Sequence, residues 1–320
     1  MLKEKYFPIA KNTIRTFSDK FNRWAIRQIF LVEPEEYFFL LNEKILLTDR
    51  APGKYDDITL AINLISSINP LSRYPGKKLE KGLFPALEPA YYTGRIPDDI
   101  ADGHRPLPEG FENYQDWINH LKICLDSDFR DISIDYTFEY LFKKAYERLL
   151  PLQKHGDDVK DEYNKFFDAM VVENSRRVNR EIKTEEELLA LNWESFSHVQ
   201  NIAFIAIKSS ARVTKKSGLS ALPELLGRGY SIRDLKKDLA DNVCNIPKEV
   251  LEQSGLSFQQ LSENPELVDT NEILQLWMSE EIKKCKQLIK ILDKEKLDLT
   301  GKLLVKALTS SLKKNISKLD

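Results

Sequence analysis

The chain has 320 residues, of which 42% are hydrophobic and 31% are charged, and its formal net charge is −2 at pH 7. A nucleic-acid-binding domain should be markedly basic, so this balance argues against a nucleic-acid partner. The three cysteines are scattered along the chain, which argues against a disulfide framework and against a zinc site.

Helical periodicity is the dominant pattern of the chain. Apolar side chains recur at helical spacing from residue 138 until Pro151, and a second such stripe begins at Tyr163. Thr184, followed three residues later by Glu187, predicts a capping box that opens the next helix. We further expect a loop at 103–116 and helices at 219–241, 270–292 and 300–318.

Extended alternation of apolar and polar residues is hard to find, and glycine is scarce, so a large sheet is not expected. We therefore predict one all-α domain over residues 1–320. Within it we distinguish an irregular N-terminal extension (1–75), a helical bundle (76–300) and a C-terminal helix (301–320).

Two acidic segments far apart in the sequence share one spacing. The outer carboxylates are Asp98 and Asp102 in the first segment, and Asp234 and Asp238 in the second. Residues at i and i+4 lie one turn apart on the same face of a helix, where two like charges repel each other. Two such pairs suggest a cation between them, and Mg²⁺ carrying a diphosphate suits carboxylate ligands.

The first acidic segment belongs to a longer polar stripe. Tyr91, Arg95, Asp98 and Asp102 recur at intervals that place all of them on one helical face. Such a face is a poor core but a reasonable wall for a polar pocket, because a buried charge needs a partner or a metal. Pro97 lies within the segment and favours a kink just before the acids.

These residues resemble the motifs of a known family. The stripe from Tyr91 to Asp102 resembles the first aspartate-rich motif of the squalene/phytoene synthase family, and Arg233–Asp238 resembles its second. The stretch 245–256 is similar to the usual continuation of the second motif. Residues 167–170 are similar to the family's Asp-Gly-Met helix, with Glu173 where a further acid is usual. The resemblance covers roughly residues 80–260.

The resemblance implies an isoprenoid-synthase-type helical bundle around a central cleft. It also implies a Mg²⁺-dependent prenyltransferase that condenses two farnesyl or geranylgeranyl diphosphates head to head and releases diphosphate. NADPH would be a further cofactor if the product is squalene. By the same resemblance the metal ligands and catalytic carboxylates are Asp98, Asp102, Asp234 and Asp238, the catalytic polar group is Tyr91, and the substrate-binding residues are Arg95, Arg233, Asp168 and Tyr230.

The chain also departs from the family pattern. Tyr230 stands where an Asn is usual, Asn245 where a Tyr is usual, and Phe196 and Gln200 where small residues make room for a prenyl chain. The aromatic stripes at 138–146 and 163–170 are available to line an apolar channel, although an ordinary core is the commoner use of such residues.

Two other functions remain open. A class I terpene cyclase or head-to-tail prenyl synthase shares the first motif, but Asp238 and Asn242 stand where the second cyclase motif has a hydroxyl and a glutamate. A non-catalytic relative that acts as an assembly or interaction protein would fit the altered residues near Phe196.

Two features bear on where in the cell the protein is expected. No run approaches the length of a membrane span and the N-terminus has no signal-peptide core, so we expect a cytoplasmic protein. Residues 280–290 mix four lysines with two glutamates, which indicates a solvated face; peripheral contact with an anionic membrane is the alternative. The oligomeric state is left open.

Overall fold

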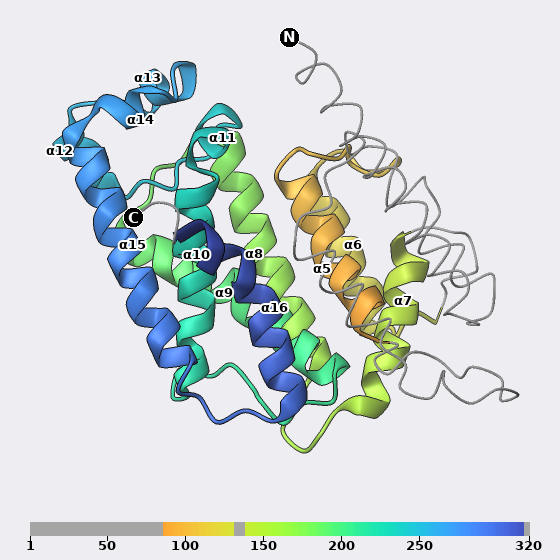
Figure 1. The fold of residues 1–320 in the computed structure, drawn as a ribbon. Coiled ribbons are helices and arrows are strands. Elements are labelled where there is room, and N and C mark those ends of the chain that lie inside the picture. The colour runs from red at the N-terminus through yellow and green to blue at the C-terminus, as the bar shows by residue number, and fades with distance from the viewer. Residues whose placement is uncertain (1–85, 131–137, 317–320) are drawn as a thin grey trace, which may run out of the picture.

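The computed structural model describes residues 86–130 and 138–316 (Figure 1). Every regular element in these two ranges is a helix, which confirms the predicted all-α fold. The expected N-terminal extension 1–75 lies outside the described residues.

The helices keep the labels of Figure 1. Their bounds are α5 (Leu87–Ala101), α6 (Tyr114–Asp126), α7 (Phe138–Leu149), α8 (Val159–Asn179), α9 (Glu185–Ala206), α10 (Ala221–Arg233), α11 (Leu235–Ala240), α12 (Lys248–Ser254), α13 (Phe258–Glu263), α14 (Leu267–Thr270), α15 (Glu272–Leu292) and α16 (Leu299–Ile316), with 3₁₀ turns η1 (Leu150–Leu152) and η2 (Gly218–Ser220).

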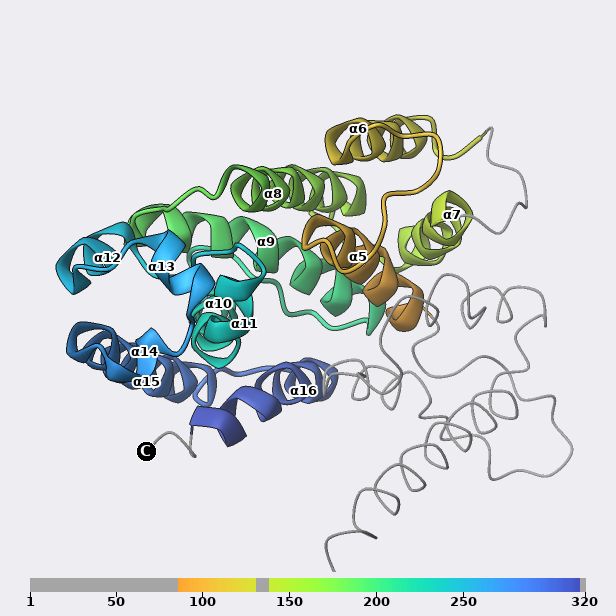
Figure 2. The same ribbon diagram turned by 90° about the horizontal axis from the view of Figure 1, so that it is seen from above.

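The helices form successive layers, which are clearest from above (Figure 2). Helix α9 packs between α8 and α10, and α10 packs in turn against α15 and α16. Helix α5 contacts α7, α8 and α9, so its acidic end lies within the same bundle as α10 and α11.

The aromatic stripes form the core of this bundle. The rings of Phe142 and Tyr163 lie 4.6 Å apart between centroids, those of Phe142 and Phe167 lie 5.4 Å apart, and all three side chains are fully buried. Edge-on packing of this kind adds to the stabilisation that burial of the rings provides. These rings pack against one another in the core of the bundle, and their use as the lining of an apolar channel stays a prediction.

Several helix ends agree with the sequence-based prediction. Thr184 accepts a hydrogen bond from the Glu187 amide at 3.2 Å, and the Glu187 carboxylate accepts one from the Thr184 amide at 2.8 Å. The predicted capping box is therefore confirmed. Helix α7 ends at Leu149, just before Pro151.

The continuous helix expected at 219–241 is wrong. It is divided at Asp234, which ends α10 and precedes α11, with φ −104° and ψ 5°. Aspartate favours helix ends because its short side chain competes for local hydrogen bonds. The Asp238 amide nevertheless donates to the Asp234 carbonyl at 2.9 Å, so the two carboxylates remain one turn apart.

Close packing of α10 on α9 depends on one glycine. A Cβ atom built on Gly227 would lie 2.2 Å from Cγ of Asn192. No larger residue fits there without moving one of the helices. Glycine therefore stands at this position for reasons of packing.

A buried ionic network joins three helices at one end of this layer. Arg228 of α10 donates to Glu281 of α15 at 2.6 Å, to Glu224 at 2.8 Å and to Glu185 of α9 at 3.0 Å. Lys284 bonds Glu185 and Glu281 at 2.8 and 2.9 Å. Arg228 and Glu281 are both buried, so their attraction offsets the cost of removing the two charges from water.

Candidate functional site

Near its C-terminal end, helix α5 positions two half-buried carboxylates, Asp98 and Asp102, and one fully buried carboxylate, Asp99. Arg95 bonds Asp98 through Nη1 at 2.6 Å and Asp99 through Nη2 at 2.8 Å, and Arg105 Nε bonds Asp99 at 3.1 Å. Asp99 is buried, whereas the side chains of Asp98 and Asp102 keep 36% and 41% of their exposure. Asp99 thus holds Arg95 in place, and Arg95 orients Asp98.

The end of α5 is held by neighbouring helices. Pro97 does not interrupt the helix, and its carbonyl accepts a hydrogen bond from the Tyr114 hydroxyl at 2.9 Å. The Ala101 carbonyl accepts from Arg177 of α8 at 2.7 Å. Gly103 adopts φ 74°, a conformation that favours glycine, and turns the chain toward His104.

Helix α11 is anchored by its apolar face. Leu235 and Leu239 are buried in a second apolar cluster with residues of α12 to α15. Asp238 and Asp234 lie on the other face of this short helix, and each has a partner that orients it. Arg233 bonds both oxygens of Asp234, and Asn245 donates to Asp238 at 2.8 Å.

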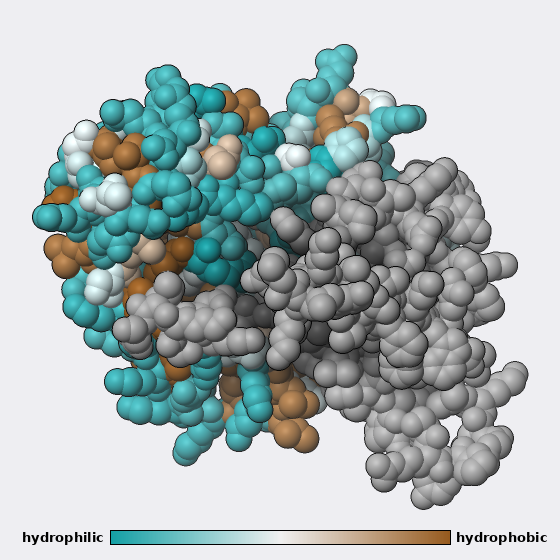
Figure 3. All heavy atoms as spheres, turned by 45° about the horizontal axis from the view of Figure 1, so that its top comes forward, coloured by the Kyte–Doolittle hydropathy of each residue, from teal (hydrophilic) through white to brown (hydrophobic). Residues whose placement is uncertain are grey.

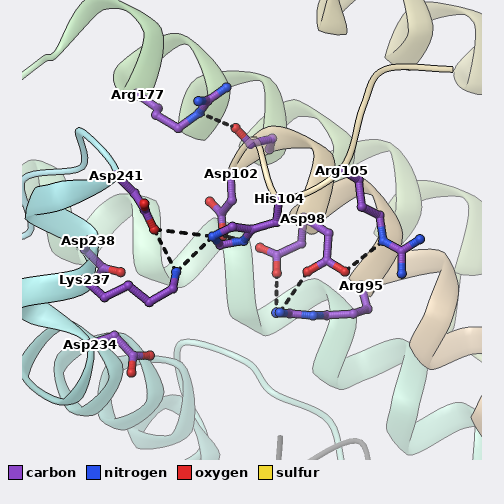
Figure 4. Close-up of polar contacts among 12 residues, drawn as sticks. Arg95, Asp98, Asp102, His104, Arg105, Arg177, Asp234, Lys237, Asp238 and Asp241 are labelled. Carbon is purple, nitrogen blue, oxygen red and sulfur yellow. Dashed lines mark hydrogen bonds and ion pairs between the residues drawn. The ribbon is translucent and has the colours of Figure 1, made fainter. Parts of the chain in front are cut away.

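The two acidic segments face each other. In Figure 4, Asp98 and Asp102 from α5 lie opposite Asp238 and Asp234 beside α11, with Lys237 between them. Their charges act on one another across this space, because Asp102 raises the pKa of Asp238. The structure therefore brings together the four aspartates whose spacing first indicated a site.

Burial and neighbouring negative charges raise the pKa values of three of these four carboxylates. Burial outweighs the attraction of Arg95 and, with the charge of Asp102, raises the pKa of Asp98 to about 7. Burial and then Glu173 raise the pKa of Asp102 to about 6. Burial and the charge of Asp234 raise the pKa of Asp238 to about 7. Desolvation and like charges both disfavour an ionised carboxylate, so a bound cation would relieve the repulsion.

Glu173 of α8 joins the group from a third helix. Burial and the charge of Asp98 raise its pKa, although Arg176 opposes the effect. Arg176 bonds Glu173 at 3.2 Å and also donates to Asn245, which in turn holds Asp238. A single buried arginine thus links the acid of α8 to the acidic face of α11.

The remaining predicted residues are distributed more widely. Tyr91 is partly buried, with its ring 5.3 Å from that of Tyr92. Tyr230 lies beneath the Arg233 guanidinium, whose carbon is 4.4 Å from the ring centroid. Asp168 is exposed and pairs with Lys122 of α6, so it does not join the group of carboxylates.

The two altered positions of α9 occupy space in the bundle. The ring of Phe196 lies 6.0 Å from that of Tyr230. Gln200 is 3% exposed, and its amide finds no hydrogen-bond partner among the described residues. These side chains fill room that small residues would leave open.

The donor set suits a hard cation bound together with an anion. Among residues 86–130 and 138–316, no three His, Cys, Asp or Glu side chains gather closely enough to hold an ion by themselves. Mg²⁺ usually takes only one or two carboxylates and completes its octahedral shell with water and substrate phosphates. Asp98 and Asp102 on one side, and Asp238 and Asp234 on the other, are the carboxylates that would provide such ligands.

Sequence reasoning missed His104, Lys237 and Asp241, which lie between or beside the two acidic segments (Figure 4). His104 lacks a ligand-spaced partner in the sequence, and Lys237 is one of many lysines. Only the approach of α5 to α11 brings them together.

The raised pKa values predict how stability depends on pH. Asp98 and Asp238 have pKa values of about 7 in the folded chain and an ordinary value of 3.8, so the folded state binds more protons between these limits. Stability from these groups is therefore present at low pH and lost as pH rises toward 7. Because water partly screens the repulsion, we expect about 1 kcal/mol in total.

Urea unfolding at pH 5.5 and pH 8 measures this effect. The difference between the two pH values should shrink in the double variant Asp98→Asn/Asp238→Asn, which cannot titrate at these positions. An equal pH dependence in both proteins would contradict the raised pKa values of these two carboxylates in the folded chain.

The predicted contact with a membrane can be compared with two features of the described residues. None of the helices among the described residues is both long enough and apolar enough to span a membrane. On the face drawn in Figure 3, apolar side chains form patches separated by hydrophilic ones. Peripheral membrane contact stays a prediction.

No protein-family model and no curated protein matches this chain.

Proposed function

We propose that this chain is a Mg²⁺-dependent prenyltransferase that joins two prenyl diphosphates head to head and releases diphosphate. The observation that carries the proposal is the opposition of Asp98 and Asp102 to Asp238 and Asp234, with pKa values raised to about 6 or 7 in three of the four. Crowded carboxylates of this kind occur where a protein binds a cation or controls a proton.

Two arginines fix the orientation of the site's aspartates. Arg95 orients Asp98 and is itself fixed by buried Asp99, and Arg233 grips Asp234. When bound, Mg²⁺ would supply positive charge to a departing diphosphate, whose negative charge grows as the allylic bond breaks. The role of the protein is to hold the carboxylates in position before substrate arrives.

Three further residues support an ordered site. Glu173, Arg176 and Asn245 connect α8 to Asp238 through side-chain contacts. Such support keeps ligands within the narrow geometry that a metal site requires. The Arg233 guanidinium stacks on the Tyr230 ring at the edge of the same site, and the two side chains would form one wall of the space for the diphosphate.

A non-catalytic role is the second candidate. The large ring of Phe196 and the buried amide of Gln200 favour this second candidate, because both side chains reduce the room for a hydrocarbon chain. A protein that kept the acidic site for binding alone would show metal-dependent ligand binding without turnover.

Incubation of the purified chain with labelled farnesyl or geranylgeranyl diphosphate and Mg²⁺, with and without NADPH, tests the proposal. We expect release of diphosphate and a product with a doubled carbon skeleton. A cyclic product of unchanged carbon number would favour a terpene cyclase. No turnover with either substrate would contradict the prenyltransferase proposal.

A further inference from the structure

Figure 4 shows the side chain of Lys237 reaching from α11 into the space between the two acidic segments. Its ammonium lies 2.9 Å from Oδ2 of Asp241 and 2.9 Å from Nε2 of His104. Its charge lowers the pKa of Asp102 on one side and of Asp238 on the other. Lys237 therefore lies in the field of both acidic segments.

His104 completes a chain of contacts from α5 to α11. Its Nδ1 lies 3.7 Å from Asp102, and its Nε2 lies 3.4 Å from Asp241, which ends α11. The ammonium of Lys237 contacts Nε2 on the other side of the ring, so the imidazole lies between Asp102 and Lys237. These contacts hold the ammonium in the space between the two acidic segments, which we call the gap.

The ammonium has a donor to spare. A protonated lysine has three N–H donors, and the described residues give Lys237 two partners, Asp241 and His104. Its side chain is 51% exposed, so a ligand in the gap can reach the third donor. A positive charge at this position repels a bare metal ion and attracts the phosphate groups that accompany one.

We propose that Lys237, positioned by His104 and Asp241, binds the diphosphate group of the substrate directly, so that the site takes up metal and diphosphate together in preference to metal alone. The inference rests on the proposed function and adds a binding residue to it. A simple surface ion pair is the competing explanation, and such a pair contributes little to stability and nothing to ligand affinity.

Lys236 provides a matched control. It is the adjacent residue and carries the same side chain, but it bonds Glu266 at 2.5 Å and Asp269 at 2.6 Å. Lys236→Met and Lys237→Met therefore remove the same charge from neighbouring places, only one of which faces the gap.

Calorimetric titration of the full chain, with Mg²⁺ alone and with inorganic pyrophosphate in the presence of Mg²⁺, measures the two affinities. In Lys237→Met the affinity for pyrophosphate with Mg²⁺ should fall about tenfold, as for the loss of a charged hydrogen bond. The affinity for Mg²⁺ alone should rise about threefold, because a nearby positive charge is gone. Lys236→Met should match the wild type in both titrations, and Lys237→Arg should recover most of the pyrophosphate affinity.

The outcomes separate this inference from the proposed function. If the wild type binds pyrophosphate with Mg²⁺ and Lys237→Met binds it equally well, the inference is overturned and the proposed function stands. If the wild type binds neither probe, both are overturned. Equal weakening in Lys236→Met and Lys237→Met would show a general effect of surface charge and would also overturn the inference.

Discussion

Replacement of Asp238 by Asn should lower the turnover of prenyl diphosphate by about 10²–10³-fold, because Asp238 would hold the Mg²⁺ that stabilises the developing negative charge, and loss of one such stabilising group has an effect of this size. The substitution keeps the shape of the side chain and an oxygen that can accept from Asn245, but it removes the charge that faces Asp102. Asp98→Asn should have the same effect from the other side of the gap. Steady-state kinetics with saturating Mg²⁺ measure both.

The folded state should survive these substitutions. Each removes one of a set of mutually repelling carboxylates, so the melting temperature should stay the same or rise at pH 8. Asp161→Asn is the control, because Asp161 is an exposed aspartate paired with Lys165 away from the site. Near-normal turnover in Asp98→Asn or Asp238→Asn would remove the basis of the proposed function.

Replacement of Arg228 by Met should destabilise the chain by about 3–5 kcal/mol, the usual cost of leaving a buried charge without its partner. Arg228 donates hydrogen bonds to three carboxylates, one each from α9, α10 and α15. Without Arg228, buried Glu281 would lose its closest hydrogen-bond partner. Unfolding in urea, followed by circular dichroism, measures the change.

A second substitution distinguishes the buried pair from a general loss of packing. The double variant Arg228→Met/Glu281→Met should recover much of the lost stability, because it leaves no unpaired charge on α15. Lys283→Met, which removes an exposed partner of Glu280, should change stability by less than about 0.5 kcal/mol. A double variant no more stable than Arg228→Met would mean that packing of the arginine, and not its charge, maintains this end of the bundle.

The helices follow closely from local sequence signals. The capping box at Thr184 and the stop before Pro151 depend on neighbours a few residues away, so the sequence alone predicts them. The break at Asp234 was not predicted, because an apolar stripe continues on both sides of it. It depends on the separate packing of Leu235 and Leu239 into the second apolar cluster.

Part of the site was predictable because it also depends on a local sequence signal. The four aspartates repeat one spacing, and that spacing is a local property of the sequence. His104 contacts Lys237 and Arg176 contacts Asn245, and both contacts join residues that are distant in the chain, so they depend on how α5, α8 and α11 meet. Asp168 shows the converse, because a position that a motif indicates can face away from the site once its helix is packed.

Anomalous diffraction from crystals grown with Mn²⁺ and inorganic pyrophosphate tests the central claim most directly. The account predicts a metal peak between Asp98 or Asp102 of α5 and Asp238 or Asp234 beside α11, with pyrophosphate oxygens completing its coordination. Crystals that show ordered carboxylates and no metal in that space, or a metal bound only elsewhere on the chain, would contradict it.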